Sequence, residues 1–113
     1  MRTKEDEKQV EAFRELGKQV LGDGWVFRLA ALVGVATRTA QRWAAGTSPV
    51  PDGVVNELRL QKHLLEASGL AEKAQGLADE AIAAGVSPHV VSAQMKELGR
   101  RLRPGPEDQD DNS

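Results

Sequence analysis

Two arginines and one glutamine, which can make paired hydrogen bonds to base edges, occur within one short stretch of the chain, Arg38-Thr39-Ala40-Gln41-Arg42. Arginine can donate two parallel hydrogen bonds to guanine O6 and N7, and glutamine can make a paired contact with adenine N6 and N7. Helical positions i, i+3 and i+4 share one face, so Arg38, Gln41 and Arg42 would project together. We therefore predict that four residues contact bases in a DNA major groove: Thr37, Arg38, Gln41 and Arg42.

The interval around these residues contains no acidic side chain. Between residues 24 and 51 there are three arginines and no aspartate or glutamate, a composition that suits a surface approaching phosphates. The longer segment 24–63 carries a net charge of +3, from Arg28, Arg38, Arg42, Arg59 and Lys62 against Asp52 and Glu57. The last ten residues carry −4, from Glu107, Asp108, Asp110 and Asp111, and the whole chain stands at −2. The negative total therefore does not exclude a polyanionic partner.

Two short helices are predicted to position the candidate side chains. The first has an apolar face at i, i+3, i+4 and i+7, formed by Val26, Leu29, Ala30 and Val33. Gly34 ends this helix at a place where a positive φ suits the turn. The second helix runs from about Thr37 to Ala45 and stops at Gly46. Its inward face is Ala40, Trp43 and Ala44, so we expect Trp43 to be a core residue and not a stacking platform.

The rest of the chain is predicted to be helical too, which gives an all-α fold of about five to six helices. Apolar residues recur at helical spacing in four further segments: about 3 to 21, 52 to about 67, 70 to 84, and the segment after Ser87-Pro88. Asp52 is expected to be the N-cap of the second of these helices. The carboxylates of the first helix, Glu5 to Glu15, alternate with lysine and arginine and are interpreted as a solvated face and not as a catalytic pair. We predict a helix-turn-helix core over 1–67 with its motif at 26–45, a C-terminal helical region over 68–103, and a disordered acidic tail over 104–113.

The segment LAALVGVATRTAQRWAAG followed by PVP resembles the lambda-repressor-like (Cro/repressor) helix-turn-helix family. Within that family it is similar in appearance to small phage, prophage or plasmid regulators. The resemblance covers about Gly24 to Leu58. It implies base contacts from the start of the second helix and from one turn later. Two positions differ: Ala36 stands where many relatives have a capping serine, and Val26-Phe27 where some have a phosphate-binding glutamine. Phosphate contacts are expected instead from Arg28, Thr39, Thr47 or Ser48.

The resemblance also implies a homodimer on a nearly palindromic operator, since twofold operators match twofold proteins. We place the predicted dimer surface on the C-terminal helices, at Leu77, Ile82, Val91, Met95, Leu98 and Leu102. The alternative is that these residues pack back on the body of the protein. The expected function is a dimeric transcriptional repressor, often of its own gene, with activation left open. The rival interpretation is a protein-interaction module, such as an antitoxin or an adaptor.

Composition argues against several other classes of protein. The chain has no cysteine, so disulfides, thiol nucleophiles and thiolate metal sites are ruled out and a reducing cytoplasm, in a prokaryotic or phage-infected cell, is expected. His63 and His89 lack further ligands at metal-binding spacing, and the serines lack a glycine-flanked elbow. We expect no enzyme activity, no metal, no cofactor and no membrane segment.

Overall fold

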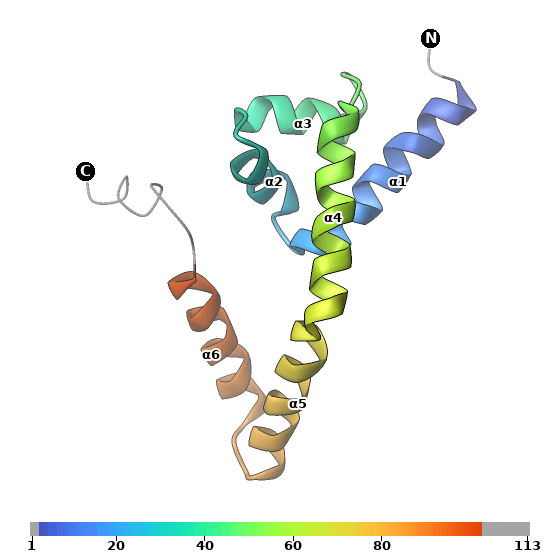
Figure 1. The fold of residues 1–113 in the computed structure, drawn as a ribbon. Coiled ribbons are helices and arrows are strands. Elements are labelled where there is room, and N and C mark those ends of the chain that lie inside the picture. Colours follow the sequence, from blue (N-terminus) through green and yellow to red (C-terminus); the bar gives the residue numbers. More distant parts are fainter. Residues whose placement is uncertain (1–2, 103–113) are drawn as a thin grey trace, which may run out of the picture. The chain divides into compact units, whose positions relative to one another are not determined.

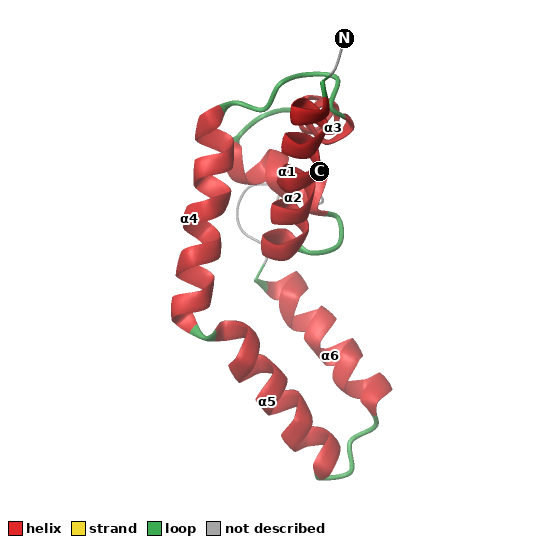
Figure 2. Cartoon of the chain, turned by 90° about the vertical axis from the view of Figure 1, so that its right-hand side faces the viewer, coloured by secondary structure: helices red, strands yellow, loops and turns green. Residues whose placement is uncertain are grey.

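The computed structural model describes residues 3–102, and within them it contains six helices and no strand (Figures 1 and 2). The helices are α1 (Lys4–Leu21), α2 (Trp25–Val33), α3 (Thr37–Ala45), α4 (Asp52–Ser68), α5 (Leu70–Ala83) and α6 (Pro88–Arg101). The all-α fold class is therefore confirmed. The acidic tail predicted over residues 104–113 lies outside the described residues. The chain forms two compact units, residues 1–69 and residues 70–113.

Helix boundaries follow local stop and start signals in most places. α3 has the predicted bounds, and Gly34, Gly46 and Gly69 cap α2, α3 and α4 in the left-handed conformation. The expectation that Asp52 caps α4 is wrong, because Pro51 is the N-cap and Asp52 is the first helical residue. There its carboxylate still favours the helix, since the N-terminal end carries partial positive charge.

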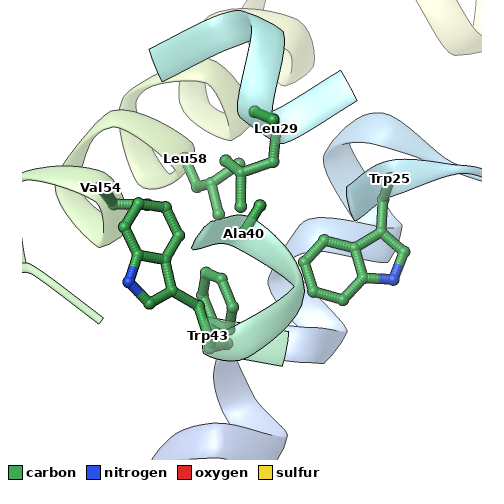
Figure 3. Packing of buried hydrophobic residues seen from close by; sticks show 8 residues of the cluster. Trp25, Leu29, Ala40, Trp43, Val54 and Leu58 are labelled. Atoms are coloured by element: carbon green, nitrogen blue, oxygen red, sulfur yellow. The ribbon is translucent and has the colours of Figure 1, made fainter. Parts of the chain in front are cut away.

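The first unit has a continuous apolar core to which α1, α2, α3 and α4 all contribute (Figure 3). Its buried residues are Phe13, Trp25, Leu29, Ala30, Ala40, Trp43, Val54 and Leu58. Phe13 and Trp25 meet edge to face, with ring centroids 5.4 Å apart and ring planes at 77°, a favoured aromatic geometry. Trp43 is only 5 % exposed, which confirms that it is a core residue.

A glycine in the middle of α1 lets the indole of Trp25 approach the helix backbone. A Cβ atom built on Gly17 would lie 2.7 Å from Cζ3 and 2.9 Å from Cδ2 of Trp25, far inside the normal contact distance of about 3.5–4.0 Å between carbons. Only glycine fits this position without movement of the ring. Gly17 therefore fixes how closely the start of α2 packs on α1.

The second unit is a helical hairpin in which α5 and α6 contact one another (Figure 2). Ser87 caps α6 by accepting a hydrogen bond from the His89 amide at 3.1 Å, and Pro88 occupies the first turn, as the sequence predicts. Neither helix contains a buried residue. The hairpin therefore differs from the first unit in having no core of its own within the described residues.

Candidate nucleic-acid interface

The bend between α2 and α3 is a tight turn built on one glycine and one carbonyl. Gly34 has φ 75° and ψ 38°, in the left-handed region, where other residues except asparagine and aspartate are disfavoured. The amides of Gly34 and Val35 both donate to the Ala30 carbonyl, at 2.9 and 3.0 Å. These bonds satisfy the end of α2 while the chain turns, so α3 begins only three residues after α2 ends.

Small side chains allow the two helices to pack against each other behind this turn. Ala30 of α2 is 3 % exposed and Ala40 of α3 is fully buried. Trp43, one turn beyond Ala40, packs in the same core beside Val54 and Leu58 of α4 (Figure 3). The inner face of α3 therefore packs against α2 and α1 and contributes to a core shared with α4, which determines the face that α3 presents to solvent.

That outer face carries three of the four predicted base-contact residues. Arg38, Gln41 and Arg42 are all exposed and lie at i, i+3 and i+4 on α3, so the structure brings them together as predicted. Thr37 is half-buried at the start of the helix. None of the ion pairs between residues 3 and 102 involves Arg38 or Arg42, so both guanidinium groups keep their charge uncompensated by a carboxylate.

The four candidate phosphate-contact residues lie in different environments. Arg28 is exposed on α2 and takes part in no ion pair among the described residues, whereas Thr39 is half-buried on α3. The Thr47 hydroxyl donates to the Arg42 carbonyl at 3.3 Å, and the amides of Thr47 and Ser48 reach the same carbonyl at 3.0 and 3.4 Å. Thr47 thus helps to terminate α3, and a phosphate contact through its proton would require that hydrogen bond to break.

The N-terminal end of α3 has no side-chain cap. Its N-cap residue is Ala36, which makes no side-chain hydrogen bond, while the amides of Thr39 and Ala40 turn back to the Ala36 carbonyl. No acidic residue lies in the first turn. The first amides and the helix dipole therefore add partial positive charge to the end of α3 that carries Thr37 and Arg38.

Arg14 of α1 is a positioning residue that the sequence interpretation missed. Its Nε donates to the Ala44 carbonyl in the last turn of α3 at 2.7 Å, and its Nη1 pairs with Glu11 at 3.2 Å. The carboxylates of α1 are all exposed, as the interpretation of a solvated face predicts, whereas Arg14 is half-buried. The available signal was its register, since Arg14 lies at i+4 from Val10 and i−3 from Gly17, on the face that packs inward.

Most of the predicted dimer residues are exposed to solvent. Leu77, Ile82, Met95, Leu98 and Leu102 are exposed in the second unit, whereas Val91 is half-buried.

No group of three histidine, aspartate or glutamate side chains within residues 3–102 is arranged to hold a metal ion. None of the six described helices combines the length and the apolar character that a membrane crossing needs.

No family model, curated protein or solved structure matches the chain.

Proposed function

We propose that the protein is a sequence-specific, double-stranded DNA-binding transcriptional regulator in which α2 and α3 form a helix-turn-helix. The observation that carries this proposal is the exposed side of α3, where Arg38, Gln41 and Arg42 stand together while Ala40 and Trp43 anchor the opposite side in the core. These are side chains that can distinguish guanine and adenine from other bases through paired hydrogen bonds. A helix anchored from behind can hold them at a defined register.

The dimensions and charge of this surface suit the major groove. An α-helix with its side chains is about 10–12 Å in diameter, and the groove is about 12 Å wide. Arg28, Arg38 and Arg42 supply positive charge, and no acidic residue from 24 to 51 opposes it. Arg28 lies on α2, the helix before the one that carries the proposed base contacts, and would contact the flanking phosphates.

In this proposal the protein acts as a homodimeric repressor on a nearly palindromic operator. Two copies of α3 would enter successive major grooves, so the half-sites would be about 34–36 Å apart or a multiple of that distance. Thr37 would assist the base contacts from the start of α3. The remaining phosphate contacts would come from Thr39, Thr47 and Ser48.

The test is selection of operator sequences from a random duplex library, followed by gel-shift titration of the selected site. We expect a palindromic consensus, and we expect Arg38→Ala or Arg42→Ala to cost about 1–3 kcal/mol, roughly 5- to 150-fold in affinity, at one base position in each half-site. Arg59→Ala, another exposed arginine in the same unit, is the matched control and should leave the consensus unchanged. If neither α3 variant alters affinity or consensus, the assignment of α3 as the helix that contacts bases is wrong.

The same titration at two salt concentrations separates this function from a protein-interaction module. A DNA-binding regulator shows a sequence preference and a steep loss of affinity with salt. An adaptor or antitoxin that has the same fold without DNA binding shows neither.

A further inference from the structure

The α5–α6 hairpin exposes most of its large apolar side chains. Leu77 is 64 % exposed and Leu98 is 49 % exposed, and no residue of either helix is buried. The exposed set is Leu70, Leu77, Ile82, Val86, Val90, Met95, Leu98 and Leu102. Ordering a residue costs about 1–2 kcal/mol of backbone entropy, and a hairpin without a fully buried residue recovers little of this cost. A second surface must cover these side chains.

The half-buried positions of the hairpin are mostly small residues, whereas its large apolar residues are mostly exposed. The half-buried positions on α5 include Ala74, Ala78 and Ala81, which recur at i, i+4 and i+7 and therefore share one face. Val91 is the half-buried apolar residue of α6. A seam of alanines brings two helices close together, and the leucines beside it remain available for another pair of helices.

The charges of the hairpin are separated between its two ends. We define the turn end as residues 77–94 and the open end as residues 70–76 with 95–102. The turn end has Asp79 and Glu80 and no lysine or arginine, which is a net charge of −2. The open end has Lys73, Lys96, Arg100 and Arg101 against Glu72 and Glu97, a net charge of +2.

The ion pairs inside the open end do not remove this imbalance. Glu97 pairs with Arg100 at 2.7 Å and with Arg101 at 3.8 Å, so one carboxylate serves two guanidinium groups. Along α5, Asp79 and Glu80 lie six and seven residues from Lys73, a rise of about 9–10 Å, which is about one screening length at 0.1 M salt. The two ends therefore act as separate charged patches of opposite sign.

We propose that a second copy of this chain covers the hairpin in an antiparallel arrangement, with the turn end of each copy on the open end of the other. Each pairing of −2 with +2 then occurs twice, and the two hairpins form a four-helix bundle around their exposed apolar side chains. A second copy is the partner that supplies the same apolar face together with the reversed charge order. A parallel arrangement would place like charges together at both ends.

This inference rests on the proposed function only in that a dimer brings two copies of α3 together on DNA. The pairing itself can be measured without DNA. It assigns the predicted dimer residues to one bundle core, namely Leu77, Ile82, Val91, Met95, Leu98 and Leu102. It also predicts that the pairing weakens with salt, because exposed charges contribute to it.

The decisive experiment is a charge exchange measured by sedimentation velocity on the full chain. Asp79→Lys with Glu80→Lys makes the turn end positive, and Arg100→Glu with Arg101→Glu makes the open end negative. We expect each double variant alone to dimerise at least tenfold more weakly than the wild type at low salt, and an equimolar mixture to form the heterodimer. In the mixture every turn end again faces an open end of opposite sign, so rescue excludes simple loss of structure as the cause. Unchanged homodimers, or a mixture that fails to associate, would overturn the antiparallel pairing.

A matched pair of leucine variants tests which unit carries the interface. Leu98 of α6 and Leu64 of α4 are 49 % and 50 % exposed, so Leu98→Asp and Leu64→Asp perturb equally solvated positions. We expect monomers from Leu98→Asp and dimers from Leu64→Asp. The reverse result would place the interface on α4 and contradict the proposal.

The two proposals fail separately. Normal dimers with no DNA preference would refute the proposed function and leave the pairing intact. Specific DNA binding by a protein whose charge-exchange variants still dimerise normally would refute the pairing and leave the function intact.

Discussion

Gly17 shows how one residue determines the packing of two helices in this protein. The indole of Trp25 occupies the space that any Cβ at position 17 would need. The same ring also meets Phe13 edge to face. The aromatic contact at the start of α2 therefore depends on the absence of a side chain at Gly17.

We predict that Gly17→Ala destabilises the first unit by about 1–3 kcal/mol, because overpacking a filled core costs about that much. The effect opposes helix propensity, which favours alanine over glycine by roughly 1 kcal/mol in a helix interior. Urea denaturation followed by tryptophan fluorescence measures it. Gly53→Ala in α4 is the control, since no atom outside its local backbone lies within 4 Å of a Cβ there, and it should be neutral or slightly stabilising.

At the scale of elements, α3 is held from three sides. α2 and α1 pack against it, its buried residues share a core with those of α4, and Arg14 of α1 binds the Ala44 carbonyl in its last turn. A positive group at the C-terminal end of a helix is favourable because the unpaired carbonyls there carry partial negative charge. Arg14 therefore links α1 to the helix that carries the candidate base contacts.

We predict that Arg14→Ala lowers stability by about 1 kcal/mol, which is below the about 1.5–3 kcal/mol typical of a hydrogen bond to a charged group because the side chain is partly solvated. It should also weaken operator binding although Arg14 is not a proposed DNA contact, because α3 loses an anchor. Thermal unfolding and gel-shift titration measure the two effects. Glu11→Gln removes only the exposed ion pair and should change stability by less than about 0.5 kcal/mol. Equal effects of both variants would show that the Ala44 contact contributes nothing.

For the whole molecule, the distribution of charge matters more than its sum. The chain carries −2 overall, yet the candidate DNA-binding face lies in a segment without acidic residues. Affinity for a polyanion follows the local charge at the contact surface, because screening limits each charge to about 10 Å at 0.1 M salt. A negative total is therefore compatible with DNA binding.

We predict that the affinity of the dimer for its operator falls steeply with salt and that Arg28→Ala makes this dependence shallower. Each arginine that leaves a phosphate removes about 0.9 from the slope of log K against log salt, so a dimer should lose nearly 2. The preferred operator should stay the same, because phosphate contacts do not distinguish bases. A changed consensus in Arg28→Ala would assign this residue to base reading instead.

The local features of this protein follow from the order of residues along the chain. Apolar spacing and glycine stops predicted α3 at its observed bounds, the turn at Gly34 and the inward position of Trp43, since helical periodicity and backbone freedom are properties of neighbouring residues. The exposed positions of Arg38, Gln41 and Arg42 follow from the same periodicity.

Contacts between residues far apart in the chain depend instead on how the helices pack together. Arg14 and Ala44 are 30 residues apart, and no local pattern shows that a guanidinium reaches that carbonyl or that Trp25 lies on Gly17. The apolar stripes of α5 and α6 are just as regular as those of the first unit, yet none of their residues is buried. Periodicity determines which face of a helix is apolar, whereas the surface that covers that face depends on how separate elements pack.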